Sequence, residues 1–238
     1  MSTSSLTSDV VLIPSLGRPA KDFESLAVSL SMSGFRCISI EPRSTWTPHP
    51  TFARLADEVV SCLDDTGIIR AHIIGHAFGN RLARMIAGRH PSRVDAVVLL
   101  ACGGYVDMVP EIEASFLACF DTSLDPAQHT AHVQRAFFAP GNDGAVWSHG
   151  WMPEVAAYQR AAVRSSRRAD WWEAASRRVL VVQGLQDVIA VPENGRRYAA
   201  EHPDEVTLIE IDGAGHAMLP EQPKLIESAV LQFLNQVR

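Results

Sequence analysis

The sequence predicts an α/β protein built on a mostly parallel sheet that is covered by helices on both faces. Short apolar runs alternate along the chain with segments in which apolar residues recur at the helical period. The runs are apolar at nearly every position, as in strands that are buried on both faces of a parallel sheet. Strands that alternate with helices in this way form parallel sheets, because each crossover helix returns the chain to the same edge.

The expected elements follow one another closely. Apolar runs typical of buried strands lie at 10–14, 35–40, 71–74, 94–101, 178–183 and 206–211. Helical patterns lie at 22–33, 52–66, 78–89, 193–202 and 223–237. Asp22 and Thr51 are predicted to cap the first two helices, and Gly34 and Gly67 to end them. A proline-rich loop through Trp46 precedes the second helix.

This alternation stops after residue 104. Residues 105–175 show helical and loop patterns, and they contain four of the five tryptophans. We therefore predict a helical lid at 105–175, inserted into a single core made of residues 1–104 and 176–238. Two interpretations of its aromatic residues stay open: they form a small core within the lid, or some of them line a substrate pocket. The pocket candidates are Phe137, Phe138, Trp147 and Trp151.

Composition excludes several classes of protein. The chain has 238 residues, of which 47% are hydrophobic and 20% charged, as is typical of a globular domain. The formal net charge is −6 without any dominant basic run, which argues against nucleic acid as a partner. No apolar run approaches the roughly 18 residues of a membrane span, and the first residues do not resemble a signal peptide. We expect a cytoplasmic protein.

The four cysteines show neither CxxC nor zinc-ligand spacing, so we expect free thiols in a reducing compartment. No motif for a cofactor or a metal is present. The expected partner is a small-molecule substrate, with no nucleic acid and no membrane. The sequence leaves the oligomeric state open between monomer and homodimer.

The stretch Gly75-His76-Ala77-Phe78-Gly79 joins an apolar run to a helical pattern. A strand, a sharp turn and a helix are the setting of the nucleophile elbow, G-x-S-x-G. The central residue of this elbow is held in a strained turn that exposes its side chain. Here that residue is Ala77, which carries no nucleophile. His76 precedes it and has two interpretations: it packs or hydrogen-bonds near the start of the helix, or it belongs to the substrate pocket.

Three further stretches lie at the ends of predicted strands. Asp187 follows the strand at 178–183 in a Gly-x-x-Asp turn, and His216 follows the last strand in Gly-x-Gly-His. The order elbow, Asp, His is the chain order of a hydrolase triad. Ser15 and Leu16 follow the first strand, where a loop supplies a backbone N–H to an oxyanion hole, and Ser15 is also a pocket candidate.

With these motifs the chain resembles the α/β-hydrolase fold family from about residue 9 to its end. The resemblance implies that Asp187 orients His216, which acts as general acid and base. It also implies an oxyanion hole made by the N–H groups of Leu16 and Phe78. Two departures are visible: Ala77 replaces the usual nucleophile, and the sequence has little room for the two antiparallel strands with which the full fold begins.

Ala77 admits three explanations: a natural alanine in an enzyme that uses water directly, an engineered replacement of serine, or a binding protein on this scaffold. Ser15 and Cys102 are alternative nucleophiles, but neither has the geometry of the elbow. The leading hypothesis is hydrolysis of a small, largely apolar ester, amide or activated carbonyl compound by water activated at His216 and Asp187. The alternative is a catalytically silent protein that binds a small ligand.

A group of arginines precedes the strand at 178–183. Two interpretations apply to it: a solvated helix face, which is the commoner case, or recognition of an anionic substrate. The group consists of Arg160, Arg164, Arg167, Arg168, Arg177 and Arg178.

Overall fold

The computed structural model describes residues 8–43, 49–172 and 178–237. Several predicted features lie outside the described residues: the start of the chain, Trp46 in the predicted loop, the last residues of the predicted lid (173–175) and Arg177. Within the described ranges, no helix has the length and apolar character needed to cross a membrane.

Six parallel strands form one sheet in the order β2-β1-β3-β4-β5-β6. They are β1 (Ser8–Ile13), β2 (Phe35–Ser39), β3 (Ala71–His76), β4 (Val94–Leu100), β5 (Arg178–Gly184) and β6 (Val206–Ile211). The predicted parallel α/β fold is confirmed. No antiparallel strand accompanies these six in the described ranges.

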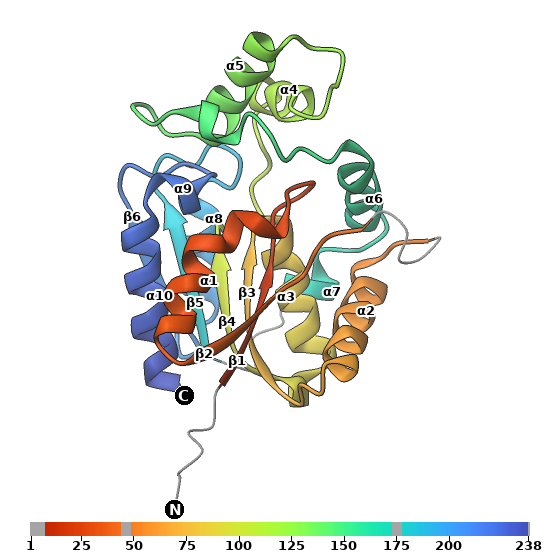
Figure 1. The fold of residues 1–238 in the computed structure, drawn as a ribbon, viewed down its shortest axis with the longest axis vertical. Coiled ribbons are helices and arrows are strands. Elements are labelled where there is room, and N and C mark those ends of the chain that lie inside the picture. The colour runs from red at the N-terminus through yellow and green to blue at the C-terminus, as the bar shows by residue number, and fades with distance from the viewer. Residues whose placement is uncertain (1–7, 44–48, 173–177, 238) are drawn as a thin grey trace, which may run out of the picture.

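Successive residues of β1 point to opposite faces of the sheet, and each face has its own apolar core. Val11 and Ile13 pack with α2 (Phe52–Asp65) and α3 (Phe78–Arg89), whereas Val10 and Leu12 pack with α1 (Glu24–Met32) and α10 (Pro223–Val237). Figure 1 shows these helices on the two sides of the sheet. Both faces are covered, which explains why the central strands are apolar at most positions.

The strand order reverses between β1 and β3, which are neighbours in the sheet although β2 lies between them in sequence. Ligands of open parallel sheets bind outside the carboxyl ends of the strands at such a reversal point. The loop after β1 contains Leu16, and the turn after β3 contains Ala77. The fold therefore places the predicted oxyanion-hole loop and the predicted nucleophile elbow at this point.

The helix starts agree with the predicted caps in one case and differ in the other. The Thr51 side chain caps α2 by accepting a hydrogen bond from the backbone N–H of Arg54. Asp22 does not cap α1: it lies inside a short 3-10 helix (Ala20–Phe23), and its carboxylate accepts from the Arg18 guanidinium instead. A buried arginine needs a counter-charge, so the ion pair takes precedence over the cap.

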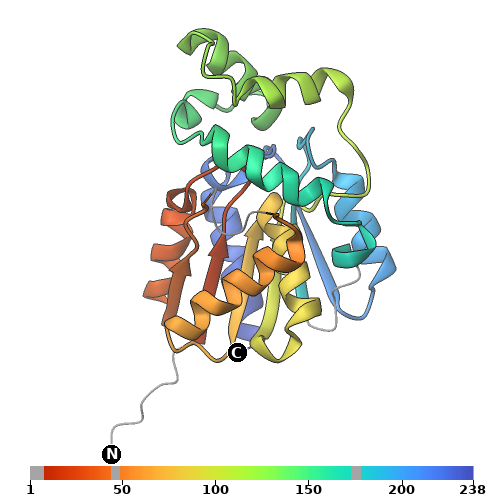
Figure 2. The ribbon, with the colours of Figure 1, turned by 90° about the vertical axis from the view of Figure 1, so that its right-hand side faces the viewer.

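The described part of the segment between β4 and β5 consists of helices and loops and contains no strand. It contains α4 (Pro110–Ala118), α5 (Pro126–Phe137), a 3-10 helix (Gly144–Trp147), α6 (Pro153–Arg164) and α7 (Ala169–Trp172). Figure 2 shows α4 and α5 lying beyond the carboxyl ends of the strands. The last part of the segment belongs to the core, because Trp171 and Trp172 pack with α3 and with Tyr198 of α8 (Pro192–Glu201).

Candidate active site

Ala77 forms the turn between β3 and α3 with φ 51° and ψ −107°, a conformation that costs a non-glycine residue about 1–3 kcal/mol. The two flanking glycines explain why the turn persists. A Cβ on Gly75 would collide with the carbonyl oxygen of Gly79, and a Cβ on Gly79 would collide with that of Ile13. The backbones approach closely only because both side chains are absent, and this approach holds Ala77 in place.

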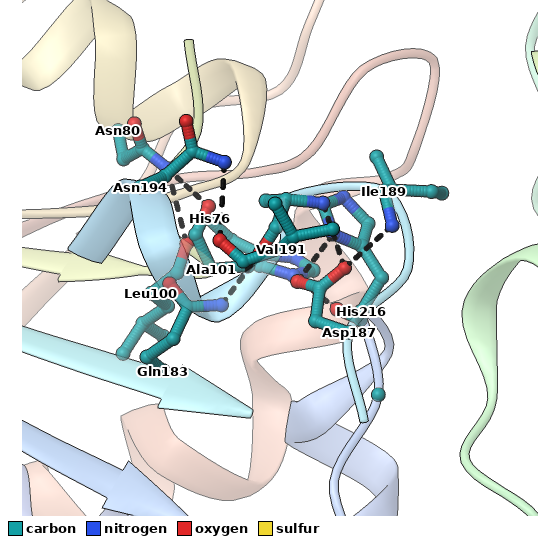
Figure 3. Close-up of polar contacts among 12 residues, drawn as sticks. His76, Asn80, Leu100, Ala101, Gln183, Asp187, Ile189, Val191, Asn194 and His216 are labelled. Carbon is teal, nitrogen blue, oxygen red and sulfur yellow. Dashed lines mark hydrogen bonds and ion pairs between the residues drawn. The ribbon is translucent and has the colours of Figure 1, made fainter. Parts of the chain in front are cut away.

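A second strained alanine lies beside the first. Ala101, directly after β4, has φ 54° and lines the same cavity as Ala77. The buried Asn80 side chain donates hydrogen bonds to the carbonyl oxygens of Leu100 and Ala101 (Figure 3). These bonds connect the first turn of α3 to the end of β4 and fix the floor of the cavity.

Asp187 and His216 meet beneath the helical segment. The His216 Nδ1 lies 2.8 Å from Asp187 Oδ2, and the other carboxylate oxygen accepts from the backbone N–H groups of Ile189 and Ala190 at 2.9 and 2.8 Å (Figure 3). The Asp187 side chain is fully buried. Three hydrogen bonds to one carboxylate stabilise its charged form in this buried place.

This arrangement determines the tautomer of His216. A carboxylate oxygen can only accept, so Nδ1 carries the proton that the pair shares. The free lone pair is then on Nε2. His216 lines the cavity together with Ala77, so a basic nitrogen is available to whatever the cavity contains. The hydrogen bond between Asp187 and His216 that the motif order predicts is present.

His76 does not line the cavity, so its assignment to the substrate pocket is wrong. It is fully buried behind His216, and its Nε2–H donates a 2.8 Å hydrogen bond to the His216 carbonyl oxygen. Its side chain alternates with that of Ala77 along the strand, which points it away from the turn. His76 therefore supports the loop that carries His216.

The buried position of His76 makes the stability of the fold depend on pH. Burial lowers the pKa of His76 from 6.5 to about 3, and the charge of His216 adds to this effect. Between these values the unfolded chain binds more protons than the fold, so stability decreases as the pH falls below about 6.5. From about pH 7 to 5, this residue should account for about 2 kcal/mol of lost unfolding free energy.

Urea unfolding of the parent and of His76→Phe at the two pH values measures this effect. The variant should be less stable at about pH 7, but it should lose about 2 kcal/mol less than the parent on acidification. His149→Gln, which changes an exposed side chain, is the matched control and should keep the pH dependence of the parent. An equal loss in the parent and His76→Phe would contradict the argument.

Leu16 and Phe78 line the same cavity as Ala77, and the backbone N–H of each is a candidate donor. Phe78 is the first residue of α3, and the N–H groups of a first helical turn have no acceptor within the helix. For the N–H of Leu16, no acceptor exists among the described residues. The Leu16 loop is clamped by α6: the N–H of Gly17 donates to Gln159 Oε1 at 2.7 Å, and its carbonyl accepts from Met152 at 3.0 Å.

A cavity of about 340 Å³ lies over these groups. Its wall includes Ser15, Leu16, Ala77, Phe78 and His216 from the predicted site. The four predicted lid aromatics do not belong to it. The apolar part of the wall comes from other side chains: Val106, Met108, Phe116, Leu117, Val163 and Ile189.

The lid aromatics pack with one another and with Arg18 instead. The Arg18 guanidinium lies 4.2 and 4.6 Å from the ring centres of Trp147 and Trp151, so cation–π contacts occupy both rings. Phe137 stacks on Phe116 and also contacts the rings of Trp147 and Trp151. Phe138 meets Trp147 edge to face. Of the two interpretations that the sequence left open, the structure favours a small core within the lid.

Several charged side chains of the cavity wall lie outside the predicted site. Arg81, Asp107 and Glu113 line the cavity, as do Arg160 and Arg164 from the arginine group. One signal was available: Arg81 follows Phe78 by three residues, which places both on one face of α3. The remaining arginines of the group that the structure describes do not line this cavity.

The alternative nucleophiles differ in their positions. Cys102 is fully buried, burial raises the pKa of its thiol, and it is absent from the cavity wall. A buried thiol with a raised pKa is a poor nucleophile. Ser15 does line the cavity, but it lies on the loop after β1 and not in the elbow. No three His, Cys, Asp or Glu side chains group as metal ligands within the described ranges.

A model of the alpha/beta hydrolase family matches residues 10–229. The chain belongs to the alpha/beta hydrolase family. The predicted α/β-hydrolase fold and the predicted membership of a hydrolase family are confirmed. Within the family, the chain is 27% identical to "Putative carbamate hydrolase RutD" of Caulobacter sp. (strain K31), over 92% of this chain and 93% of that protein.

Solved alpha/beta hydrolase structures superpose over nearly the whole chain. "Putative non-heme bromoperoxidase BpoC" from Mycobacterium tuberculosis H37Rv has a TM-score of 0.82 at 21% identity, covering 97% of this chain and 93% of that one. The enol-lactonase from Burkholderia xenovorans LB400 has a TM-score of 0.80 at 20% identity, covering 98% and 94%. At these identities the similarity shows the fold alone.

Proposed function

We propose that this protein hydrolyses a small ester, amide or activated carbonyl compound with a water molecule that His216 and Asp187 activate. One observation carries the proposal: His216, whose Nδ1 is bonded to Asp187, lines one cavity together with Leu16, Phe78 and Ala77. Ala77 takes the place of the nucleophile, and the room that a hydroxyl would fill is available to water.

The reaction proceeds in two steps. His216 Nε2 takes a proton from water as the oxygen attacks the carbonyl carbon, and the oxyanion that forms accepts hydrogen bonds from Leu16 and Phe78. Asp187 stabilises the imidazolium without taking its proton. When the intermediate collapses, the imidazolium protonates the leaving oxygen or nitrogen. Water and the carbonyl compound thus give an acid and an alcohol or amine, with no covalent enzyme intermediate.

The cavity supports a small substrate. Its volume of about 340 Å³ is near the lower limit for small-molecule sites. Leu16, Phe78 and Val163 give part of the wall an apolar character that suits a short hydrocarbon body. The relative from Caulobacter sp. is named for a carbamate, a small carbonyl compound, so carbamates join esters and amides as candidate substrates.

A panel of short esters, amides and carbamates tests the proposal. The protein should turn over at least one class at a constant rate from the first turnover, because no acyl-enzyme accumulates. Intact-mass measurement during turnover should show the unmodified chain. Acylation of any residue would contradict direct attack by water. Binding without turnover in every class would favour the silent ligand-binding alternative.

A further inference from the structure

Three arginines lie in the cavity wall or next to it. Arg81 and Arg160 line the wall, and the buried Arg84 lies one helical turn beyond Arg81 on α3. Within the described part of the chain, none of the three forms an ion pair with a carboxylate. Arg84 is buried and Arg81 and Arg160 are half-buried, so their charges are incompletely hydrated and this region favours an anion.

The surroundings hold these side chains in place. The Arg84 Nη2 donates to Asn80 Oδ1 and to the carbonyl oxygen of Gly103, at 2.8 and 2.9 Å. The guanidinium groups of Arg81 and Arg84 lie 5.3 and 4.7 Å from the ring centre of Trp171. Burial lowers the pKa of Arg81 to about 10, and the nearby charge of Arg84 adds to this. A bound anion would relieve both effects.

The two cations come from the same elements that hold the oxyanion donors. Arg81 lies three residues after Phe78, so their Cβ atoms are about 5–6 Å apart on α3. Arg160 directly follows Gln159, whose amide oxygen accepts from Gly17 beside Leu16. Arg81 and Arg160 line the same cavity as Leu16 and Phe78, so an anion held by these arginines would share that cavity with the carbonyl that is hydrolysed.

The acidic residues of the wall limit the charge of this anion. Asp107 and Glu113 also line the cavity, and both are exposed, as is Arg164. The arginines of the wall are Arg81, Arg160 and Arg164. Against its two carboxylates, they leave the wall with one net positive charge, apart from His216. One net charge matches a carboxylate better than a phosphate monoester, which carries nearly two negative charges. Guanidinium groups bind the planar carboxylate through paired hydrogen bonds.

From these contacts we propose that Arg81 and Arg160 form a carboxylate subsite. The substrate would then carry a free carboxylate two or three carbons from the carbonyl that is hydrolysed. This inference rests on the proposed function and specifies its substrate class: short hemiesters or hemiamides of dicarboxylic acids, with an apolar linking chain.

Two esters of equal shape test the subsite. Monoethyl succinate carries the carboxylate, and ethyl 4-methylpentanoate replaces it with an uncharged isopropyl group. The parent should prefer the anionic ester in kcat/KM by at least about tenfold, measured as ethanol release. Arg81→Gln and Arg160→Gln should each lower this preference at least about fivefold. Arg167→Gln is the matched control, because it removes an exposed arginine outside the cavity and should keep the preference.

Direct binding separates the subsite from the hydrolysis. Succinate should bind the parent in calorimetry, and the Arg81→Gln and Arg160→Gln variants should bind it at least about fivefold more weakly. If no ester, amide or carbamate of the panel is hydrolysed but this binding pattern holds, the proposed function fails and the subsite stands. Equal hydrolysis of both esters, with succinate binding indifferent to both arginines, would overturn the subsite and keep the function. Tighter binding of inorganic phosphate than of succinate would overturn the carboxylate assignment.

Discussion

Replacing His216 with alanine is expected to lower the rate of hydrolysis by roughly 10²–10⁴-fold, the usual contribution of a general acid–base group. In the proposed mechanism no other group takes the proton of the attacking water. The loss should appear in kcat, while KM changes little, because His216 acts on the transition state. Steady-state kinetics on the best substrate of the panel measures both parameters. The N–H donors of Leu16 and Phe78 remain and account for residual activity.

Asp187→Asn should reduce activity almost as much as His216→Ala, because backbone N–H groups fix the orientation of the new side-chain amide. The N–H groups of Ile189 and Ala190 both point at one oxygen of Asp187, so the amide oxygen stays there. The amide nitrogen then faces His216 Nδ1 and donates to it. This reverses the tautomer and puts the proton on Nε2, which can no longer accept one from water.

Asp212→Asn is the control for this pair, since it changes an exposed carboxylate on the loop that leads to His216. It should retain the activity of the parent. Hydrolysis that is indifferent to both His216→Ala and Asp187→Asn would contradict activation of water by this dyad. A loss in His216→Ala alone would contradict the orienting role of Asp187.

The fold was predictable because its signals are local. The continuous apolar runs identify strands buried on both faces, and Thr51, Gly34 and Gly67 mark helix ends. Asp187 and His216 were predictable for the same reason: each sits in a short motif directly after a strand, and parallel strands bring these ends to one edge. At that edge His216 Nδ1 lies 2.8 Å from Asp187 Oδ2.

The wall of the cavity was not predictable from such signals. Trp147 and Trp151 were candidates for the substrate pocket or for a small core within the lid, and Arg18, far away in the sequence, lies over both rings. A composition rich in aromatic residues does not tell which partner each ring takes, since several partners of similar energy compete for it. His76 was assigned to the pocket by its proximity to Ala77, although alternate residues of a strand point in opposite directions.

Ala77→Ser should introduce acyl transfer, which is the most direct test of the position that this alanine occupies. The new hydroxyl would lie in the cavity wall next to His216 and the oxyanion donors. His216 would then deprotonate serine in place of water. We expect hydrolysis of short activated aryl esters to rise by at least about 100-fold, with a burst of phenol release and one acyl group per chain in intact-mass measurement.

The substitution should leave the fold intact. Serine and alanine have the same Cβ, so both meet the same steric strain at φ 51°. Urea unfolding should therefore differ by only a few tenths of a kcal/mol. The double variant Ala77→Ser with His216→Ala is the matched control, and it should show neither the burst nor the acyl group. A stable Ala77→Ser protein that is not acylated would mean that the dyad and the N–H donors are not arranged for attack from this turn, and the proposed hydrolysis would lose its geometric basis.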